Sequence, residues 1–510
     1  MPGGLVQLVA YGAQDLYLTG NPQITFWKTV YRRYSNFAME NINVYFDTAP
    51  NLTTSSMTQI QVKIPRNGDL LSNIYFTIDM PDIYSDEYLQ FKWIPNFAQR
   101  FVRRATVSIN GMQVDQQYSQ WLNIWAQLTQ TEGKRLTYDN LTANIPSYTQ
   151  PSIYYGNFGD TVIPTINARR VYVPIPFWFC TNPGLAIPLI ALQRSDVYVD
   201  LELAPLNDLF TVRGYSVDMV LNGSTFDYVV DQQEADNIQS YMTARGVNDP
   251  NNWFWYFVNG TQAPTGKWAQ NYFLSSKYIY LDDDERRKFA QSTHEYLITQ
   301  VDEYSVADIN VTNYTLNFKF QHPSKEIILV TQRNDVFLFN QWFNYTAKIN
   351  NQKITTLQDL YTQFVKDPNL NSIDNLLHPL VNAVNVANKT AGSINIFDDA
   401  GANILLAARL LFNGNERFEE VDYVFLNYLQ PYETHTFCPD KGIYQYSFSL
   451  NPETFQPSGT ANFSRINKAE YELRLRTFKR KNTGVNLSIY THNMNVLRIM
   501  GGLGGLVFSN

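Results

Sequence analysis

The fold of this chain is decided by the stretch Gly442-Ile443-Tyr444-Gln445-Tyr446-Ser447-Phe448-Ser449-Leu450, which continues through Asn451-Pro452 to Gln456-Pro457-Ser458-Gly459-Thr460-Ala461-Asn462-Phe463-Ser464-Arg465-Ile466. Its first part alternates apolar and polar side chains, as is typical of a half-buried β-strand. Two prolines and a glycine, Pro452, Pro457 and Gly459, then predict a connection of fixed shape. A second alternating strand is expected at 469–475. The stretch therefore predicts strand, rigid loop and strand, and its middle holds no catalytic residue type.

The composition of the whole chain indicates a large β-rich protein. Of its 510 residues, 44% are hydrophobic, which is enough for two or three domains. Aromatic residues make up 15%, including 34 Tyr and 32 Phe, and these residue types favour strands. The net charge of −7 provides no basic field that would attract a phosphate backbone. Direct nucleic-acid binding is therefore disfavoured.

The cysteines and the N-terminus predict where the protein folds. Cys180 and Cys438 lie far apart in the sequence, so a disulfide framework is excluded and folding in the cytosol is the simpler interpretation. Residues 1–5 show neither a basic region nor a long apolar core, so no signal peptide is expected. No apolar run reaches the roughly 18 residues that a membrane span requires. The sequence predicts a soluble protein without a membrane span.

Short alternating segments recur in two sets along the chain. The first set comprises residues 42–46, 60–64, 74–80, 102–109, 171–175, 185–192 and 197–203. The second set comprises residues 278–281, 295–301, 314–320, 326–330, 404–412, 443–450, 471–475 and 485–490. About eight strands match one antiparallel sandwich. We therefore expect an all-β chain with an N-terminal arm at 1–24, a first sandwich at 25–220, and a second sandwich with a C-terminal tail at 221–510.

Four tryptophans are candidate packing or interface anchors. A helix is expected over residues 116–130, with Trp121 and Trp125 on one face. Trp253 and Trp255 belong to a dense aromatic cluster. Clustered aromatics usually mark packing, and tryptophan is also enriched at interfaces. The sequence leaves core packing and a subunit contact open for these four residues.

Catalytic and metal-binding patterns are missing from the sequence. The five histidines are His294, His322, His378, His435 and His492. Since no two of them lie within four residues, neither an H-x-H pair nor H-E-x-x-H occurs, which counts against a metal-dependent cupin. The glycine-rich segment 501–505 lacks the G-K-[ST] of a phosphate loop and is interpreted as a flexible tail. Acidic residues followed by basic ones at 282–288 suit a short exposed helix. We expect no catalytic residues, no metal and no cofactor.

Asn-x-Ser/Thr triplets are candidate glycosylation sites. They occur at Asn51, Asn140, Asn222, Asn259, Asn310, Asn313, Asn344, Asn388, Asn462 and Asn486. In a chain without an expected signal peptide these sites need not be modified, and a high Asn and Thr content produces many of them by chance.

Several motifs together resemble the signature of the major capsid proteins of nucleocytoplasmic large DNA viruses. The stretch 442–466 is one of them. The others are Gly12-Ala13-Gln14-Asp15 with Leu18-Thr19-Gly20-Asn21-Pro22-Gln23-Ile24-Thr25-Phe26, Pro174-Ile175-Pro176-Phe177-Trp178-Phe179, Asn182-Pro183-Gly184-Leu185-Ala186-Ile187-Pro188-Leu189, His322-Pro323-Ser324-Lys325-Glu326-Ile327 and Asn413-Gly414-Asn415-Glu416-Arg417-Phe418. They keep the family's order and cover essentially the whole chain.

The resemblance implies a structural virion protein. Two consecutive eight-stranded antiparallel jelly rolls per chain are expected, with short helices and long loops. A homotrimer would give a capsomer with a pseudo-hexagonal outline, and capsomers would tile an icosahedral shell after assembly in the host cytoplasm. The implied partners are neighbouring capsomers and, through the N-terminal arm, minor capsid proteins on the inner face. The long segments 131–170 and 340–400 are expected to face outward.

Two alternative functions remain open from sequence. The first is a glycan-binding jelly-roll virion protein of the fibre or lectin type, whose loops rich in Tyr, Asn and Asp would stack on sugars. The second is a carbohydrate-active enzyme on a β-sandwich, which needs two carboxylates at a fixed separation. The 46 acidic residues leave such a pair open.

Overall fold

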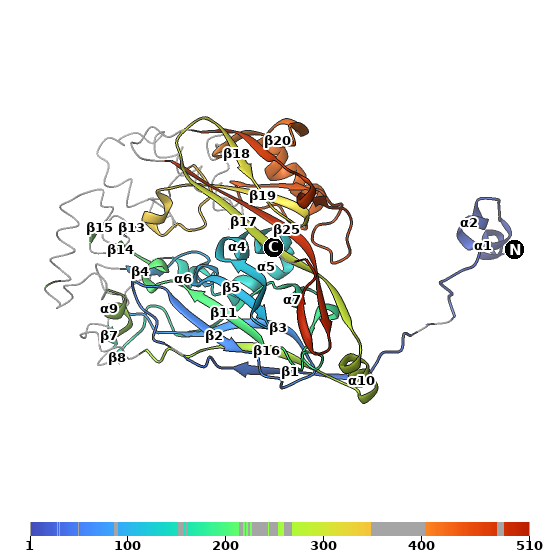
Figure 1. The fold of residues 1–510 in the computed structure, drawn as a ribbon, viewed down its shortest axis with the longest axis horizontal. Coiled ribbons are helices and arrows are strands. Elements are labelled where there is room, and N and C mark those ends of the chain that lie inside the picture. Colours follow the sequence, from blue (N-terminus) through green and yellow to red (C-terminus); the bar gives the residue numbers. More distant parts are fainter. Residues whose placement is uncertain are drawn as a thin grey trace.

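Two β-sandwiches that lie side by side form the body of the computed structural model (Figure 1). The structure describes the chain except residues 1, 28, 30, 49, 86–89, 151–156, 159–160, 214–217, 220, 223–224, 227–242, 244–252, 260–267, 348–402, 477–483 and 509–510. The segment expected at 340–400 thus lies mostly outside the described residues. Among the described residues, no helix is long and apolar enough to cross a membrane.

The first sandwich, called the first roll below, consists of two sheets. Sheet A has the order β1-β16-β3-β10, with β9 also paired to β3, and sheet B has the order β2-β11-β5-β6. The strands of sheet A are β1 (Phe37–Val44), β3 (Leu70–Met80), β9 (Arg169–Pro174), β10 (Ile187–Pro188) and β16 (Tyr272–Leu281). Those of sheet B are β2 (Thr58–Lys63), β5 (Val102–Ile109), β6 (Met112–Tyr118) and β11 (Val197–Leu203).

The second sandwich, called the second roll, has the same plan. Sheet C has the order β17-β25-β19-β22, with β23 and β26 attached, and sheet D has the order β18-β24-β20-β21. The strands of sheet C are β17 (His294–Ile309), β19 (Pro323–Arg333), β22 (Ile443–Ser447), β23 (Ala461–Asn462), β25 (Val485–Met500) and β26 (Leu503–Leu506). Those of sheet D are β18 (Asn313–Phe318), β20 (Leu405–Phe412), β21 (Asn415–Asp422) and β24 (Ala469–Leu475).

The strand order makes each sandwich a jelly roll. In chain order, the first, eighth, third and sixth main strands of each roll form one sheet, and the second, seventh, fourth and fifth form the other. The pairings are antiparallel throughout. The expected fold class, all-β with two consecutive antiparallel jelly rolls, is confirmed.

The boundary between the rolls differs from the sequence prediction. The segment 278–281 was expected to open the second set of strands, with the boundary at residue 220. Instead β16 pairs with β1 and with β3 in the middle of sheet A. The last strand of a jelly roll lies in the middle of its sheet, between strands from much earlier in the chain. A long stretch of sequence separates β16 from those strands, so the sequence pattern did not reveal the pairing. The chain passes to the second roll through helix α10 (Asp283–Gln291), which confirms the short charged helix.

Smaller elements fill the connections. The helices are α1 (Gly3–Val9), α2 (Asp15–Thr19), α3 (Phe97–Phe101), α4 (Ser119–Thr129), α5 (Glu132–Leu141), α6 (Pro146–Thr149), α7 (Trp178–Thr181), α9 (Trp253–Asn259) and α14 (Gln430–Thr434). The 3-10 turns are η1 (Pro183–Leu185), η2 (Leu206–Asp208), η4 (Val336–Phe339) and η7 (Phe463–Arg465), and η6 (Phe425–Leu429) is a π-helix. Short strands are β4 (Gln90–Trp93), β7 (Asn157–Phe158), β8 (Thr161–Val162), β12 (Phe210–Arg213), β13 (Asp218–Met219), β14 (Leu221–Asn222) and β15 (Thr225–Phe226).

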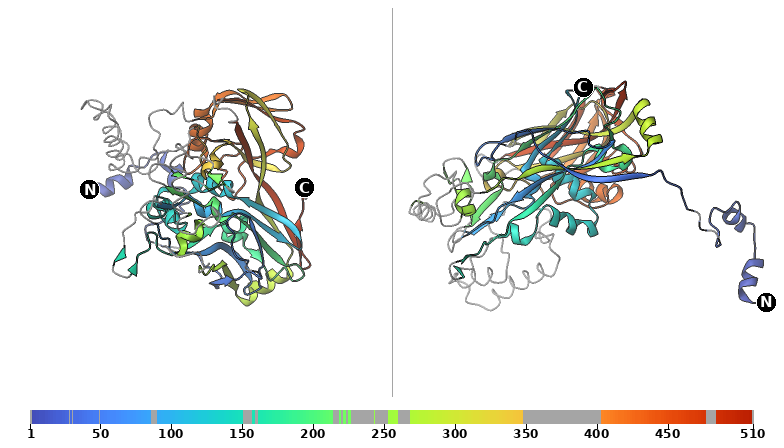
Figure 2. Two further views of the ribbon diagram at one scale, coloured as in Figure 1. Left: turned by 90° about the vertical axis from the view of Figure 1, so that its left-hand side faces the viewer. Right: turned by 90° about the horizontal axis from the view of Figure 1, so that it is seen from below.

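The N-terminal arm extends away from the two rolls. Helices α1 and α2 have no buried residue. Figures 1 and 2 show the arm leaving the body at the end where α10 lies, opposite the end that carries β7, β8 and β13–β15. The arm is therefore available to another molecule.

The signature stretch builds a strand and a rigid corner, as predicted. Strand β22 pairs with β19, and the following loop returns to β19 through β23. Gly459 has a φ of +134°, and a Cβ atom there would lie 2.7 Å from the carbonyl oxygen of Phe448. Only glycine fits this close approach. The hydroxyl of Ser458 also accepts a 2.9 Å hydrogen bond from the backbone of Asn451, which fixes the loop.

The glycine-rich C-terminal segment is an ordered hairpin, so its interpretation as a flexible tail is wrong. Strands β25 and β26 pair, and the turn between them rests on the first roll. The backbone N–H of Arg194 donates to the carbonyl of Gly502 at 3.0 Å, and the N–H of Gly504 donates to the Ser195 hydroxyl at 3.2 Å. Glycines allow this docking because a Cβ atom at Gly504 would lie 2.8 Å from Leu192 Cδ2.

We predict that Gly504→Ala destabilises the protein and that Gly505→Ala does not. A methyl group at 504 overpacks the contact with Leu192, at a cost of about 1–3 kcal/mol. At Gly505 the nearest atom is the Met112 methyl carbon at 3.7 Å, an ordinary contact. Both residues lie in β26, so the pair is matched. Urea midpoints at one protein concentration provide the measurement, and equal midpoints for the two variants would contradict the docking.

Candidate functional site

The two rolls meet where α4 of the first roll packs on the outer face of sheet C. The α4 side chains Trp121, Ile124 and Leu128 form one apolar cluster with side chains of the second roll. These partners are Val301, Ile328, Val330, Tyr345, Ile443 and Tyr490. The other face of sheet C covers the core of the second roll, which includes Ile327, Leu329 and Tyr444. Sheet C is therefore buried on both faces.

Hydrogen bonds extend this junction beyond α4. Gln300 of β17 donates to the carbonyl oxygen of Val114 in β6, so an edge strand of each roll takes part. The Gln300 side-chain oxygen accepts a 2.9 Å bond from Asn495 of β25. The Tyr490 hydroxyl donates to Gln120 of α4 at 2.6 Å. The junction thus combines apolar packing with hydrogen bonds between the two rolls.

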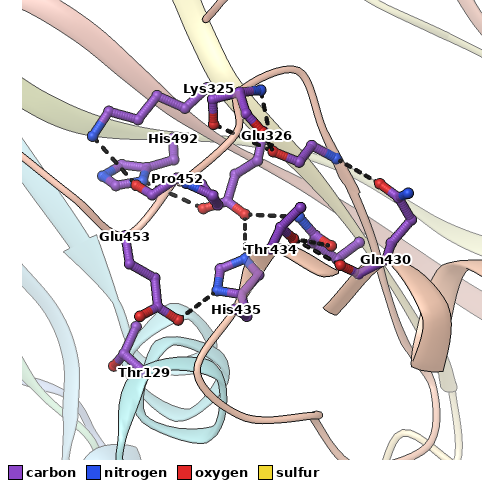
Figure 3. A network of polar contacts seen from close by, with 12 residues as sticks. Thr129, Lys325, Glu326, Gln430, Thr434, His435, Pro452, Glu453 and His492 are labelled. Carbon is purple, nitrogen blue, oxygen red and sulfur yellow. Dashed lines mark hydrogen bonds and ion pairs between the residues drawn. The ribbon is translucent and has the colours of Figure 1, made fainter. Parts of the chain in front are cut away.

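A buried carboxylate, Glu326 of β19, is the centre of a polar network at this junction (Figure 3). One oxygen of Glu326 lies 2.8 Å from Nε2 of His435 and accepts a 3.2 Å bond from Gln445 of β22. The other oxygen lies 3.4 Å from Nδ1 of His492, which is too long for a good hydrogen bond. The side chains of Glu326 and His435 are both 0% exposed.

The loop that follows β22 completes the network. Nδ1 of His435 lies 2.9 Å from Glu453, whose carboxylate also accepts bonds from the N–H and hydroxyl of Thr436. The Lys325 ammonium donates to the carbonyls of Pro452 and Thr454 at 3.3 and 2.9 Å. The rigid loop of the signature stretch therefore supplies one carboxylate and two carbonyl oxygens to the buried groups.

The charges of the network follow from its geometry. Burial by itself lowers the pKa of His435, but the carboxylates of Glu326 and Glu453 outweigh burial and raise that pKa to about 9. Burial would raise the pKa of Glu326, yet His435 and His492 hold it well below its usual range. Burial lowers the pKa of His492, with only partial opposition from Glu326. At neutral pH, His435 is thus charged between two carboxylates and His492 is neutral.

The first roll contacts both imidazoles through one tryptophan of α4. The ring of Trp125 lies edge-on to His492 at 4.9 Å and to His435 at 6.4 Å between centroids. The network therefore connects β19, the signature loop and α4, and hence the two rolls.

This arrangement suits structural stabilisation rather than turnover. The His435 imidazole is enclosed, so no substrate can reach it. Among the described residues, no group of three or more His, Cys, Asp or Glu side chains could hold a metal ion. The cysteines Cys180 and Cys438 are both free. What the site can do is hold two rolls in one relative position.

The four tryptophan anchors lie within the chain's own packing. Trp121 and Trp253 are buried, while Trp125 and Trp255 are partly buried. Trp121 and Trp125 lie at the junction between the rolls. Trp253 and Trp255 belong to α9 and pack on the core of the first roll. Whether any of them also touches another subunit stays a prediction.

The candidate glycosylation sites fall into three groups. The exposed ones are Asn51, Asn140, Asn310, Asn313 and Asn462. Asn344 and Asn486 are half-buried, and the side chains of Asn222, Asn259 and Asn388 lie outside the described residues. Asn462 accepts hydrogen bonds from the N–H and hydroxyl of Ser464, so it caps the turn η7. Modification of any of these residues stays a prediction.

The histidine network was not found from sequence. His435 and His492 lie far from each other and from Glu326 in the chain, so their spacing gives no sign of a shared site. The fold brings them together because β19 and β25 are neighbours in sheet C. The only sequence signal is that Lys325 and Glu326 interrupt an apolar strand, a pattern that indicates buried charges with partners.

Comparisons with known proteins agree with this geometry. A family model described as "Major capsid protein N-terminus" matches residues 25–245, and one described as "Large eukaryotic DNA virus major capsid protein" matches residues 285–505. The chain belongs to the major capsid proteins of large eukaryotic DNA viruses. Membership in this family makes it a structural component of the virion capsid and not an enzyme.

Relatives and solved structures cover nearly all of this capsid protein. The major capsid protein of Phaeocystis pouchetii virus is 33% identical over 572 residues, with 100% of both chains covered. That of Paramecium bursaria Chlorella virus 1 is 30% identical over 537 residues, also with 100% of both covered. A chain in a quasi-atomic model of the PBCV-1 virus capsid is similar with a TM-score of 0.62 and 26% identity, covering 95% of this chain and 100% of that one.

We predict that His435→Gln reduces the loss of stability at alkaline pH. The pKa of His435 rises from 6.5 to about 9 on folding, so its pairing contributes fully below pH 6.5 and is lost as the pH rises toward 9. The contribution is about 3 kcal/mol. The urea midpoint of the variant should therefore fall less steeply than that of the wild type between these two pH values.

His492→Gln is the contrasting variant. In the wild type, folding lowers the pKa of the His492 side chain. The wild type therefore loses stability when the pH falls below 6.5, because the unfolded chain takes up a proton there. This variant should flatten the acid side of the profile and leave the alkaline slope intact. Identical profiles for the two variants and the wild type would show that the network does not titrate with folding.

We also predict strong coupling between Glu326 and His435. Glu326→Gln leaves a buried cation with one carboxylate fewer, which costs about 3–5 kcal/mol. In the double variant Glu326→Gln/His435→Gln the charge is gone, so the loss should be smaller than the sum of the single losses by about 1–3 kcal/mol. A double-mutant cycle of urea unfolding measures this coupling, and additive losses would contradict it.

Proposed function

We propose that this capsid protein associates into homotrimers with a pseudo-hexagonal outline, which tile an icosahedral shell. One observation supports this most: each chain carries two rolls with the same strand order, side by side. Three such chains supply six equivalent rolls, and a closed ring satisfies every copy's contacts without growing a fibre. The exposed sheet edges of a jelly roll are covered by such an arrangement.

The two ends of the molecule favour different partners within this proposal. The arm exposes apolar side chains, among them Leu5, Leu8 and Leu18 at 49%, 77% and 85%. Such groups mark a surface that another protein covers. We propose minor capsid proteins at this inner face and neighbouring capsomers at the sides. The opposite end, with β7 and β8 from the excursion 131–170, would face outward (Figure 1). Assembly in the host cytoplasm stays part of the proposal, as does the lack of direct contact with the genome.

The oligomeric state tests this function directly. We predict that the purified chain elutes with three times the mass of one chain in size-exclusion chromatography with light scattering, at micromolar concentration. Negative-stain electron microscopy of the same fraction should show a pseudo-hexagonal outline. Monomers alone would overturn the trimer, and particles that bind glycan arrays without forming hexagonal outlines would favour the glycan-binding alternative.

A further inference from the structure

A hairpin followed by a helix occurs once in each roll, at equivalent positions. In the first roll, β5 and β6 are joined by Asn110-Gly111, and α4 follows. In the second, β20 and β21 are joined by Asn413-Gly414, and η6 continues into α14. The asparagines have φ values of 53° and 51°, and the glycines of 76° and 82°. These are two copies of the same turn and the same element order.

The two helices also share a residue pattern. Leu122-Asn123 of α4 and Leu426-Asn427 of η6 are separated by 304 positions (426 − 122). Both leucines are buried in the core of their own roll, and both asparagines are buried. The same offset carries Tyr118, the last residue of β6, onto Asp422, the last residue of β21. The two helical segments therefore start at corresponding positions, each with a buried Leu-Asn pair, although α4 is an α-helix and η6 is a π-helix.

This equivalence identifies an unused contact face. The offset carries Trp125 and Leu128, which face the second roll, onto Leu429 and Tyr432. Leu429 is 43% exposed and Tyr432 is 80% exposed. In the described part of the chain, nothing covers these two side chains as sheet C covers α4. The second helix thus presents an apolar face without the partner that its counterpart has.

The equivalent receptor is the outer face of sheet A. Sheet A corresponds to sheet C in strand order, and β3 corresponds to β19, since both have 11 residues and both have a bulge at the third one. Aligning β3 with β19 at this bulge gives an offset of 253 positions (328 − 75). Ile328, which lies under α4, then corresponds to Tyr75. Tyr75 is half-buried, and Tyr45, on the same face, is 62% exposed. Figure 1 shows sheet A on the side of the first roll farthest from the second.

We propose that the η6–α14 face carrying Leu429 and Tyr432 docks on the outer face of sheet A, around Tyr75, of a second copy of this chain. The contact repeats between copies the contact that α4 makes with sheet C within one chain. The helix and its receptor lie on different rolls of each chain, so the contact is heterologous. A ring of such contacts closes when the rotation between successive rolls is the same within and between chains. This inference rests on the proposed trimer and names its contact residues.

The first test is charge insertion at the helix face. Tyr432→Glu and Leu429→Glu should each weaken trimer formation at least tenfold in light-scattering titrations. Leu136→Glu is the matched control, because Leu136 is 70% exposed on another helix, α5, and should leave the trimer unchanged. Unchanged near-ultraviolet circular dichroism and urea midpoints of dilute monomer confirm that the variants fold.

The second test is cross-linking between copies. The double variant Tyr432→Cys/Tyr75→Cys, treated with a short bis-maleimide, should give covalent dimers and trimers, whereas each single variant and the wild type, with its two native cysteines, should not. Trimers that persist in both glutamate variants and give no cross-link would overturn this interface while leaving the trimer intact. A wild type that is monomeric at micromolar concentration would instead overturn the trimer itself.

Discussion

Packing of α4 on sheet C is the contact on which the rest of the chain depends. Strand β19 has nine consecutive buried residues, and β22 has four, because one face of the sheet covers the roll's own core and the other receives α4. Burial of one large apolar side chain contributes about 1.5–3 kcal/mol. The helix contributes several such side chains to this junction. Without the helix, a broad apolar face of the second roll would be left in water.

The buried charges explain why the signature stretch needs its prolines. Taking Glu326 and Lys325 out of water costs several kcal/mol for each ion unless partners are exactly placed. His435 and Gln445 provide partners for Glu326, and the loop after β22 provides the carbonyls of Pro452 and Thr454 for Lys325 and the Glu453 carboxylate for His435. A flexible loop would have to be ordered at the expense of conformational entropy, whereas prolines restrict it beforehand. The signature stretch, which contains no catalytic residue type, thus stabilises buried charged side chains.

Local sequence patterns predict the elements whose formation depends on neighbouring residues. Alternation and turn residues identified most strands, the helix around Trp121, and the rigid corner at Gly459. They failed where a segment's partner lies far along the chain. The return of β16 to sheet A follows a long excursion, and the Glu326 network unites residues more than 100 positions apart. The C-terminal glycines indicated flexibility, although Gly504 is needed for close approach to Leu192. Glycine is compatible with a flexible tail and with a close contact, and only the surface next to it determines which of the two forms.

The two corresponding helices differ in the exposure of their apolar faces, because α4 is covered by sheet C whereas Leu429 and Tyr432 are exposed. The link between the rolls is covalent, so α4 docks without the loss of translational and rotational freedom that association between molecules requires, about 4–15 kcal/mol. Its contact face can be strongly apolar because it is covered as soon as the chain folds. In the proposed trimer, the face of η6–α14 would remain in water until a second chain arrives, and an exposed pair of tryptophans there would promote aggregation. Leu429 and Tyr432 are a compromise: Leu429 is only partly exposed, and the hydroxyl of Tyr432 is compatible with water. Under the proposed assembly, the same fold element would make one contact within the chain and one contact between subunits.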